Sequence, residues 1–380
     1  MAASTAAVKP IAAPGAKPKK RSRLLSDVLV NGVLLLIVIA WLIPVVSLVV
    51  SSFRTSFDIQ TSGWWTIAPH RAWQTVTTMP VPEGVDRNGV MQIQGGQGTF
   101  EQFREGVQVG DTRLIWIGNR RTGQIQVQKQ GWTAGTNFTL DNYKEVIGGK
   151  TFEIRKPDGT TEKVQGTDML TPFLNSLIVT IPATVIPILI AAFAAYAFAW
   201  MKFPGRRPFF IMVVALLVVP LQIAFVPILK DYKALQLNGT FLGVWLAHTG
   251  FGLALAVYLL YNYIGTLPRD ILESAFIDGA SHFTIFQKLI LPLCVPALAS
   301  FAIFQFLWVW NDYLVALIFL GGTPGNQVLT MFLANIVGSR GADWHLLTAG
   351  ALVSMILPLI VFFSLQRFFV RGLLAGSVKG

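Results

Sequence analysis

The stretch FLGVWLAHTGFGLALAVYLLYNYI, residues 241–264, is predominantly apolar and contains no Asp, Glu, Lys or Arg. A helix crosses a hydrocarbon core of about 30 Å with about 20 apolar residues, because each residue adds about 1.5 Å. This stretch is therefore long enough to span a membrane. Five further runs have the same character: Val28–Val50, Phe173–Met201, Phe209–Leu229, Leu291–Leu320 and Leu346–Phe369.

The composition also indicates a membrane protein. Of the 380 residues, 53% are hydrophobic and only 13% are charged, whereas soluble domains usually carry about 25% charged residues. Prolines inside the runs, such as Pro182, Pro187 and Pro296, are tolerated where neighbouring helices satisfy the freed carbonyl groups. We therefore predict an all-α polytopic membrane protein, with a first transmembrane helix at 28–50 and a bundled core at 173–369, giving six spans.

Basic residues near the ends of the runs indicate the orientation, because Lys and Arg are held on the cytoplasmic side. They cluster before the first run, between the second and third, and around the end of the sixth: Lys17, Lys19, Lys20, Arg21, Arg23, Lys202, Arg206, Arg207, Arg367 and Arg371. The prediction is a multi-pass protein of the bacterial inner membrane with both termini, 1–27 and 370–380, in the cytoplasm. The net charge of +11 needs no nucleic acid to explain it, because topology accounts for the clusters.

Residues 51–172, between the first two runs, have a different chemistry. Two segments alternate in polarity around turns, one at 113–130 with Asn119 and Gly123 and one at 151–165 with a Pro-Asp-Gly turn. Such patterns are typical of β-hairpins. The sequence therefore predicts a β-rich extracytoplasmic insertion, in which tryptophans such as Trp116 and Trp132 are expected in the core and not as platforms for sugars.

Catalytic and metal-binding patterns are missing from the sequence. Gly148–Thr151 has the ending of a phosphate-binding loop, but Lys144 stands where its first glycine is required. The four histidines have no ligand spacing, and no nucleophile, base and orienting group come together. We expect a non-catalytic chain without a metal. The histidines are His70, His248, His282 and His345.

The loop after the fourth run contains ESAFIDGASHFTIFQKLILPL, residues 273–293. Apolar residues recur at three- and four-residue steps, which predicts an amphipathic helix over 271–288. Gly279 in its middle allows either a bend with positive φ or a close backbone approach. The pattern leaves open whether the apolar stripe lies on the membrane and bundle or binds a soluble partner. The stripe consists of Leu272, Ala275, Phe276, Gly279, Phe283 and Phe286.

Part of this loop resembles the E-A-A, three residues, G, nine residues, I-x-L-P signature of permease subunits of ABC importers. Glu273, Ala275, Gly279 and the pair Leu291-Pro292 match it, whereas Ser274 replaces the first alanine and Leu289 the isoleucine. Both differences are mild changes of size. The motif lies in the expected loop of a six-span chain.

The resemblance extends to the carbohydrate branch of these permeases. FTLDNYKEVI (138–147), FLNSLIVT (173–180), WNDYL (310–314) and QRFFVRGLLAGSVKG (366–380) are similar to the MalG-type subunit. The enlarged outer region resembles the α-glucoside permeases within this branch.

The resemblance implies several partners. A second, homologous permease pairs with the chain, a cytoplasmic ATPase dimer that binds ATP and Mg lies beneath both, and an extracytoplasmic solute-binding protein delivers the sugar. The chain itself then carries no cofactor. The ATPase-coupling residues would be Glu273, Ser274, Ala275, Phe276, Asp278, Gly279, Phe283, Phe286, Leu291 and Pro292, with tail contacts from Arg371, Gly376, Lys379 and Gly380.

The substrate path is predicted near the end of the fifth run. Asp312 is the one acid within a predicted span, and polar groups there tend to face a bundle or an aqueous path; alternatively, it caps or orients helices. The candidate path residues are Trp308, Asn311, Asp312 and Tyr313. The outer loop offers a candidate contact to the binding protein at Ser339, Arg340, Gly341, Ala342 and Asp343.

Two other classes of protein fit parts of the sequence. An ion-coupled secondary transporter is also polytopic, but it usually shows coupling-ion residues and broken helices in matched halves. A membrane-anchored sensor would use the outer domain but needs only one or two spans. Neither class explains the loop motif or the tail.

Overall fold

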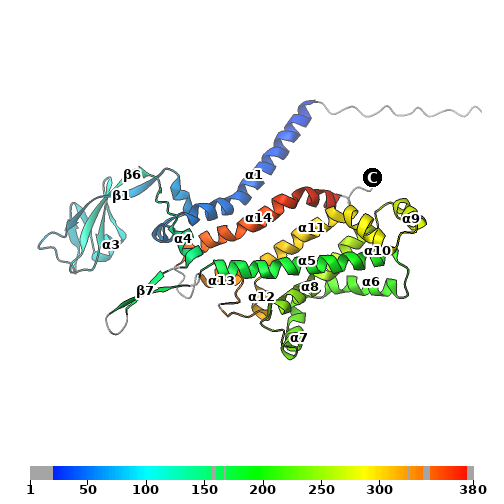
Figure 1. Ribbon diagram of the computed structural model, residues 1–380. Helices are drawn as coiled ribbons and strands as arrows, with labels where there is room; N and C mark the ends of the chain where they lie inside the picture. Colours follow the sequence, from blue (N-terminus) through cyan, green and yellow to red (C-terminus); the bar gives the residue numbers. More distant parts are fainter. Residues whose placement is uncertain are drawn as a thin grey trace, which may run out of the picture. The chain divides into compact units, whose positions relative to one another are not determined.

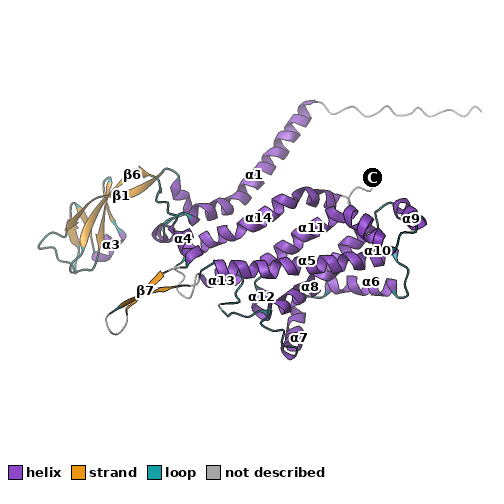
Figure 2. Cartoon of the chain, in the orientation of Figure 1, coloured by secondary structure: helices purple, strands orange, loops and turns teal. Residues whose placement is uncertain are grey.

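The computed structural model describes residues 20–149, 151–155, 160–166, 168–323, 325–336 and 343–374. The chain divides into two units, residues 1–49 and residues 50–380. The described part is predominantly helical (Figure 2). The first unit consists of helix α1 (Lys20–Ser52), which continues into the start of the second unit.

Among the described residues, five helical segments are long and apolar enough to cross a membrane: Ser26–Ser52 of α1, α5 (Leu170–Trp200), α8 (Phe241–Ile264), His282–Trp310, and Trp344–Phe368 of α14 (Trp344–Leu374). The bounds of α8 coincide with the predicted span. Helix α14 continues past the predicted end at Phe369, so residues 370–374 of the predicted tail are helical.

The predicted third span is not one straight helix. Helix α6 (Arg206–Ala215) and the 3₁₀ turn η2 (Leu216–Val218) are followed by α7 (Leu221–Ala234), and the two parts meet at an angle of 104°. Val219 is extended, with φ −74° and ψ 119°, as expected for a residue before a proline. The break at Pro220 therefore leaves five candidate spans, or six if the bent pair counts as one.

The predicted fifth span, Leu291–Leu320, is wrong at both ends. The span begins earlier, as α10 (His282–Ile285) continues through a π-helical segment η3 (Phe286–Ile290) into α11 (Leu291–Trp310). It ends at Trp310, and the short helices α12 (Leu314–Phe319) and α13 (Leu329–Ile336) follow separately. The polar residues Asn311 and Asp312, followed by Tyr313, separate α11 from α12, so the helix ends where the apolar run is interrupted.

Small residues let the central helices approach closely. Helix α5 packs along α8 and α11 (Figure 1). Ala191 and Ala195 of α5 and Ala256 of α8 are fully buried between them. In a membrane, where lipid is as apolar as leucine, such small side chains favour helix association by close packing.

Strands occupy part of the region between the first two candidate spans. A four-stranded antiparallel sheet has the order β1 (His70–Pro80), β6 (Gln124–Thr133), β5 (Thr112–Ile117), β4 (Val107–Val109). Strands β2 (Met91–Ile93) and β3 (Gly96–Gly98) form one hairpin, and β7 (Thr151–Arg155) and β8 (Thr161–Gln165) another. Short helices accompany them: α2 (Ser56–Thr61), η1 (Trp64–Ile67), α3 (Phe100–Glu105) and α4 (Asp141–Gly148).

The two tryptophans predicted for the core of this region differ. Trp116 of β5 is 3% exposed, but Trp132 of β6 is 69% exposed, so the prediction for Trp132 is wrong. Ile125 and Val127 of β6 pack in the core. Trp132 has the opposite parity, and alternate residues of a strand face opposite sides of the sheet.

Helix α4 contacts residues that come before it and residues that come after it in the sequence. The amide of Asn142 donates to the carbonyl oxygens of Ser52 and Arg54, both at 2.8 Å. Val146 packs with Trp310 and Leu346 in a separate buried cluster. The end of the insertion is thereby tied to α11 and α14 of the helical bundle.

Candidate functional site

The loop with the E-A-A-like motif forms two helices instead of the single helix predicted for 271–288. Helix α9 (Arg269–Ile277) is followed by the C-cap residue Asp278 and then by Gly279, which has φ +80°. The N–H of Gly279 donates to Phe276 O and the N–H of Ala280 donates to Ala275 O, both at 3.0 Å. These two bonds form a Schellman motif, which usually places glycine at the left-handed position. Of the two roles open to Gly279, the structure shows the bend.

The second half of the loop is continuous with a candidate membrane span. The Ser281 hydroxyl accepts a hydrogen bond from the N–H of Thr284 at 3.2 Å and caps α10. From there the helix runs through η3 into α11, which contains Leu291 and Pro292 of the motif. A force applied at the turn therefore reaches α11 without an intervening flexible link.

Part of the predicted apolar stripe is already buried inside the chain. Leu272 is fully buried and Phe286 is 3% exposed, both in the cluster formed with α5 and α8. The Phe286 ring stacks on Phe193, with centroids 4.4 Å apart. Ala275 and Phe276 are partly buried against the same cluster. Phe286 is thus inaccessible to a partner, and Phe276 is accessible only in part, because the turn folds α9 back onto the bundle.

The remaining residues of the turn face outward. Ile277 is 85% exposed and Phe283 64% exposed. The predicted apolar stripe did not include Ile277, because the stripe was drawn for a single continuous helix and the segment forms two helices. We call the outward-facing set the turn surface; it consists of Glu273, Ser274, Ile277, Asp278, Gly279 and Phe283.

A hydrogen bond joins the turn to α5. The Tyr196 hydroxyl and Nδ1 of His282 are 2.9 Å apart, and Tyr196 is 4% exposed. The His282 ring also meets the Phe276 ring edge to face, with centroids 4.9 Å apart. His282 therefore links the helix before the turn, the helix after it and α5. Its spacing in the sequence indicated only that it was not part of a metal site.

The predicted path residues lie at the other end of α11, and Asp312 has a structural role there. Its carboxylate accepts hydrogen bonds from the N–H groups of Ala316 at 3.0 Å and Val315 at 3.4 Å, and so caps α12. Its Oδ2 lies 3.8 Å from Nε2 of buried His248. The capping alternative named from the sequence accounts for these contacts.

Of the three predicted neighbours of Asp312, Trp308 shares its contact with His248. The Asn311 amide donates to Leu307 O at 2.7 Å within its own helix turn. Tyr313 is 41% exposed, and the Trp308 ring meets the His248 ring edge to face at 6.1 Å. Trp308 and Asp312 therefore meet at His248, whereas the Asn311 amide is used within its own helix turn.

Several predicted contact residues lie outside the described residues: Ser339, Arg340, Gly341, Ala342, Gly376, Lys379 and Gly380. Asp343 precedes α14, and its carbonyl oxygen accepts hydrogen bonds from the N–H groups of Leu346 and Leu347, both at 3.1 Å. Arg371 belongs to the last turns of α14.

Replacing Tyr196 with Phe removes the hydroxyl that bonds His282 and keeps the ring. We expect a loss of about 0.5–1.5 kcal/mol in the free energy of unfolding, and faster amide exchange in residues 273–286, because the turn loses its tie to α5. Hydrogen–deuterium exchange of the purified chain measures this. Tyr232→Phe is the control, since the Tyr232 hydroxyl has no hydrogen-bond partner in the described part of the chain. Equal exchange in both variants would show that the bond does not hold the turn.

Comparison with known proteins places this arrangement in a family. The family model described as "Binding-protein-dependent transport system inner membrane component" matches residues 168–374. The alpha-glucoside transport system permease protein AglG of Rhizobium meliloti (strain 1021) is 46% identical over 96% of this chain and 99% of the relative. The osmoprotective compounds uptake permease protein GgtD of Synechocystis sp. is 61% identical over 64% of this chain and 76% of the relative.

A solved structure has the same fold. It is the crystal structure of a bacterial ABC transporter involved in the import of the acidic polysaccharide alginate, whose matched chain has a TM-score of 0.60 and 16% identity. The match covers 93% of this chain and 100% of the other. Together with the family model, which covers the helices that carry the turn surface, these relatives identify the chain as a member of the binding-protein-dependent transport system inner membrane component family.

Proposed function

We propose that this chain is the transmembrane permease subunit of an ATP-driven sugar importer and couples closure of a separate ATPase to alternating access. The observation that carries the proposal is the turn surface, an exposed patch that is directly continuous with a candidate membrane span. Membership of the family and the near-full-length similarity to a sugar permease support it. In this scheme the chain pairs with a second permease, and the ATPase dimer binds ATP and Mg.

The proposed topology has six spans in the inner membrane. The bent pair α6–α7 would count as one span, with both termini in the cytoplasm and residues 51–172 outside. Lys202 lies in the α5–α6 connection, and Arg206 and Arg207 begin α6. This connection is at the same end of the bundle as α9 and α10 (Figure 1), which supports the proposed orientation. The turn surface would then face the cytoplasm, where the ATPase could bind it.

Coupling would depend on Ile277 and Phe283. A partner shifts a two-state protein only through contacts that differ between the states, so the contact must transmit movement. Each of these side chains would contribute about 1.5–3 kcal/mol if a partner covered it fully. Glu273 and Asp278 would orient the partner through polar contacts. Movement of the turn would pass to α11 through α10 and to α5 through the Tyr196–His282 hydrogen bond.

The proposed substrate is a sugar of the α-glucoside class, as a disaccharide or oligosaccharide. The similarity to the alpha-glucoside permease supports this class, because it extends over nearly the whole chain, including residues 51–172. Trp308, Asn311 and Tyr313 remain proposed path residues, with Asp312 holding α12 beside them. A solute-binding protein would contact the outer loop around residues 339–343, and the tail from Arg371 would add contacts to the ATPase.

Replacing Ile277 and Phe283 together with Ala should weaken ATPase binding by at least about tenfold, because two exposed apolar contacts are lost. Co-purification of the ATPase with the tagged permease complex, followed by titration, measures this. Ile223→Ala on α7 is the control, since Ile223 is 69% exposed but lies away from the turn. Undiminished ATPase binding by the double variant would remove the turn surface as the docking site.

Gly279→Asp should abolish sugar uptake while membrane insertion stays normal. A backbone φ of +80° is strained for a residue that carries a Cβ atom. The added carboxylate would also lie within the turn surface, where the ATPase is proposed to bind. Uptake of radiolabelled sugar and the amount of protein in isolated membranes are measured together. Gly322→Asp is a suitable control, because Gly322 lies outside the turn and no neighbouring atom lies within 4 Å of the place that an added Cβ would take. Normal uptake by Gly279→Asp contradicts the docking role.

Reconstitution of the complete complex tests the function itself. We expect ATP hydrolysis that is stimulated by the sugar-loaded binding protein, with α-glucosides more effective than other sugars or osmoprotective compounds. Uptake driven by an ion gradient without ATP would instead favour a secondary transporter. Isolation of the chain without an ATPase or a second permease would favour a membrane-anchored sensor.

A further inference from the structure

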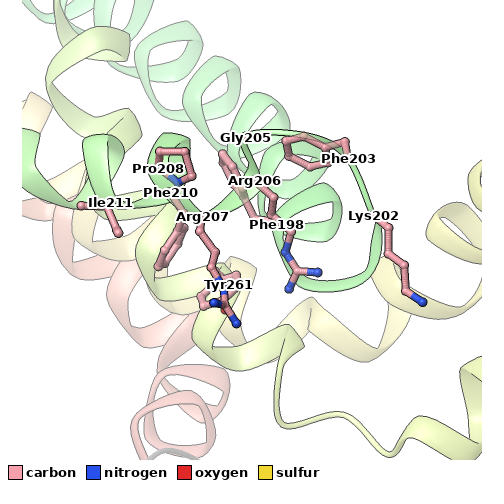
Figure 3. A pocket seen from close by; sticks show the side chains of 10 residues that line it. All are labelled: Phe198, Lys202, Phe203, Gly205, Arg206, Arg207, Pro208, Phe210, Ile211 and Tyr261. Carbon is pink, nitrogen blue, oxygen red and sulfur yellow. The ribbon is translucent and has the colours of Figure 1, made fainter.

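A pocket lies where α5 ends and α6 begins, beside α8. Its volume is about 660 Å³ (Figure 3). The three cationic side chains that line it are Lys202, Arg206 and Arg207, and its lining includes no acidic side chain. We call this cavity the basic pocket. Three positive charges without a carboxylate in the lining favour an anionic ligand, and guanidinium groups match the geometry of phosphate oxygens.

The three cations are held in different ways. Arg206 donates to the carbonyl oxygens of Met201 at 3.3 Å and Ala199 at 3.2 Å, at the end of α5. Its guanidinium is therefore fixed in place. Lys202 and Arg207 are exposed, and neither has a hydrogen bond or ion pair with the described residues. These two side chains are free to bind a ligand without breaking an existing contact.

Four aromatic residues also line the basic pocket. Consecutive ring centroids lie 5.9 Å apart for Phe203 and Phe198, 5.6 Å for Phe198 and Phe210, and 4.1 Å for Phe210 and Tyr261. The four rings come from the α5–α6 connection and three helices and form one continuous apolar surface. Aromatic residues of this kind are enriched where a membrane meets water.

The apolar surface continues out of the pocket along α6. Ile211, which lines the pocket, is 66% exposed, and the next residue, Met212, is 55% exposed. A small soluble phosphate would contact the cations and have no use for this surface. An amphiphile with a charged head and apolar chains would use both.

We propose that the basic pocket binds the phosphate of an anionic phospholipid, with the acyl chains lying along the exposed side of α6. Basic pockets between helices at the cytoplasmic side suit such headgroups. The bound lipid would join α5, α6 and α8 at the end of the bundle that carries the turn surface. The proposal requires only that the chain lies in a membrane. A failure to bind lipid would therefore leave the proposed sugar transport untouched, and a failure to transport sugar would leave lipid binding untouched.

The test uses the full-length chain in nanodiscs of phosphatidylcholine, with and without phosphatidylglycerol and cardiolipin. Native mass spectrometry after delipidation counts the lipids that the protein retains. The chain should retain anionic lipid, and the double variant K202Q/R207Q should retain at least about tenfold less, since each basic residue near an anionic surface contributes to binding. Thermal unfolding in phosphatidylcholine alone should be unchanged, because both side chains are exposed and no anionic lipid is present.

Two matched variants separate the candidate ligands. K230Q/K233Q removes the same charge from exposed positions of α7 and should retain lipid like the unaltered chain. Ile211→Asn should lower lipid retention without changing the binding of inorganic phosphate. Equal anionic-lipid retention by K202Q/R207Q and the unaltered chain overturns the proposal. So does displacement of the lipid by inorganic phosphate, or full retention by Ile211→Asn, since either would indicate a site for soluble phosphate.

Discussion

The left-handed turn at Gly279 is the constraint on which the candidate site depends. A residue with a Cβ atom adopts φ near +80° only with strain, whereas glycine allows the chain to reverse and close two hydrogen bonds to α9. The reversal folds α9 back, so that Leu272 becomes part of the bundle core. The same reversal turns Ile277 and Phe283 outward. A continuous helix over this range would have placed a different set of side chains on the surface.

Interruptions in the helices determine how the turn connects to the rest of the bundle. The π-helical segment before α11 keeps the helix continuous from His282 to Trp310, so the turn and the span form one element. By contrast, the break at Pro220 bends the α6–α7 pair by 104°, because the residue before a proline is driven toward extended geometry. The helical bundle therefore contains both a continuous segment, His282–Trp310, and a bent pair, α6–α7.

Polar contacts join helices near both ends of the continuous segment His282–Trp310. At one end, His282 and Tyr196 join the turn to α5, close to the basic pocket at the α5–α6 connection. At the other end, Asp312 caps α12 and lies near buried His248. Polar side chains in a membrane protein are costly unless they have partners, and these contacts satisfy part of that requirement. At both places the polar side chains join or cap helices.

The sequence by itself determined the elements whose cause is local. The run at 241–264 matches the bounds of α8, which begins after the capping residue Thr240 and ends before Gly265. The β5–β6 pair lies where alternation around Asn119 and Gly123 predicted a hairpin, and the motif located the loop that contains the turn. Only the tertiary structure decided which side chains of that loop are exposed to solvent and which are buried. Phe286 is covered by Phe193, which is far away in the sequence, and the basic pocket combines residues of α5, α6 and α8. Helical periodicity specifies a face, but the neighbour that covers it depends on packing between distant segments.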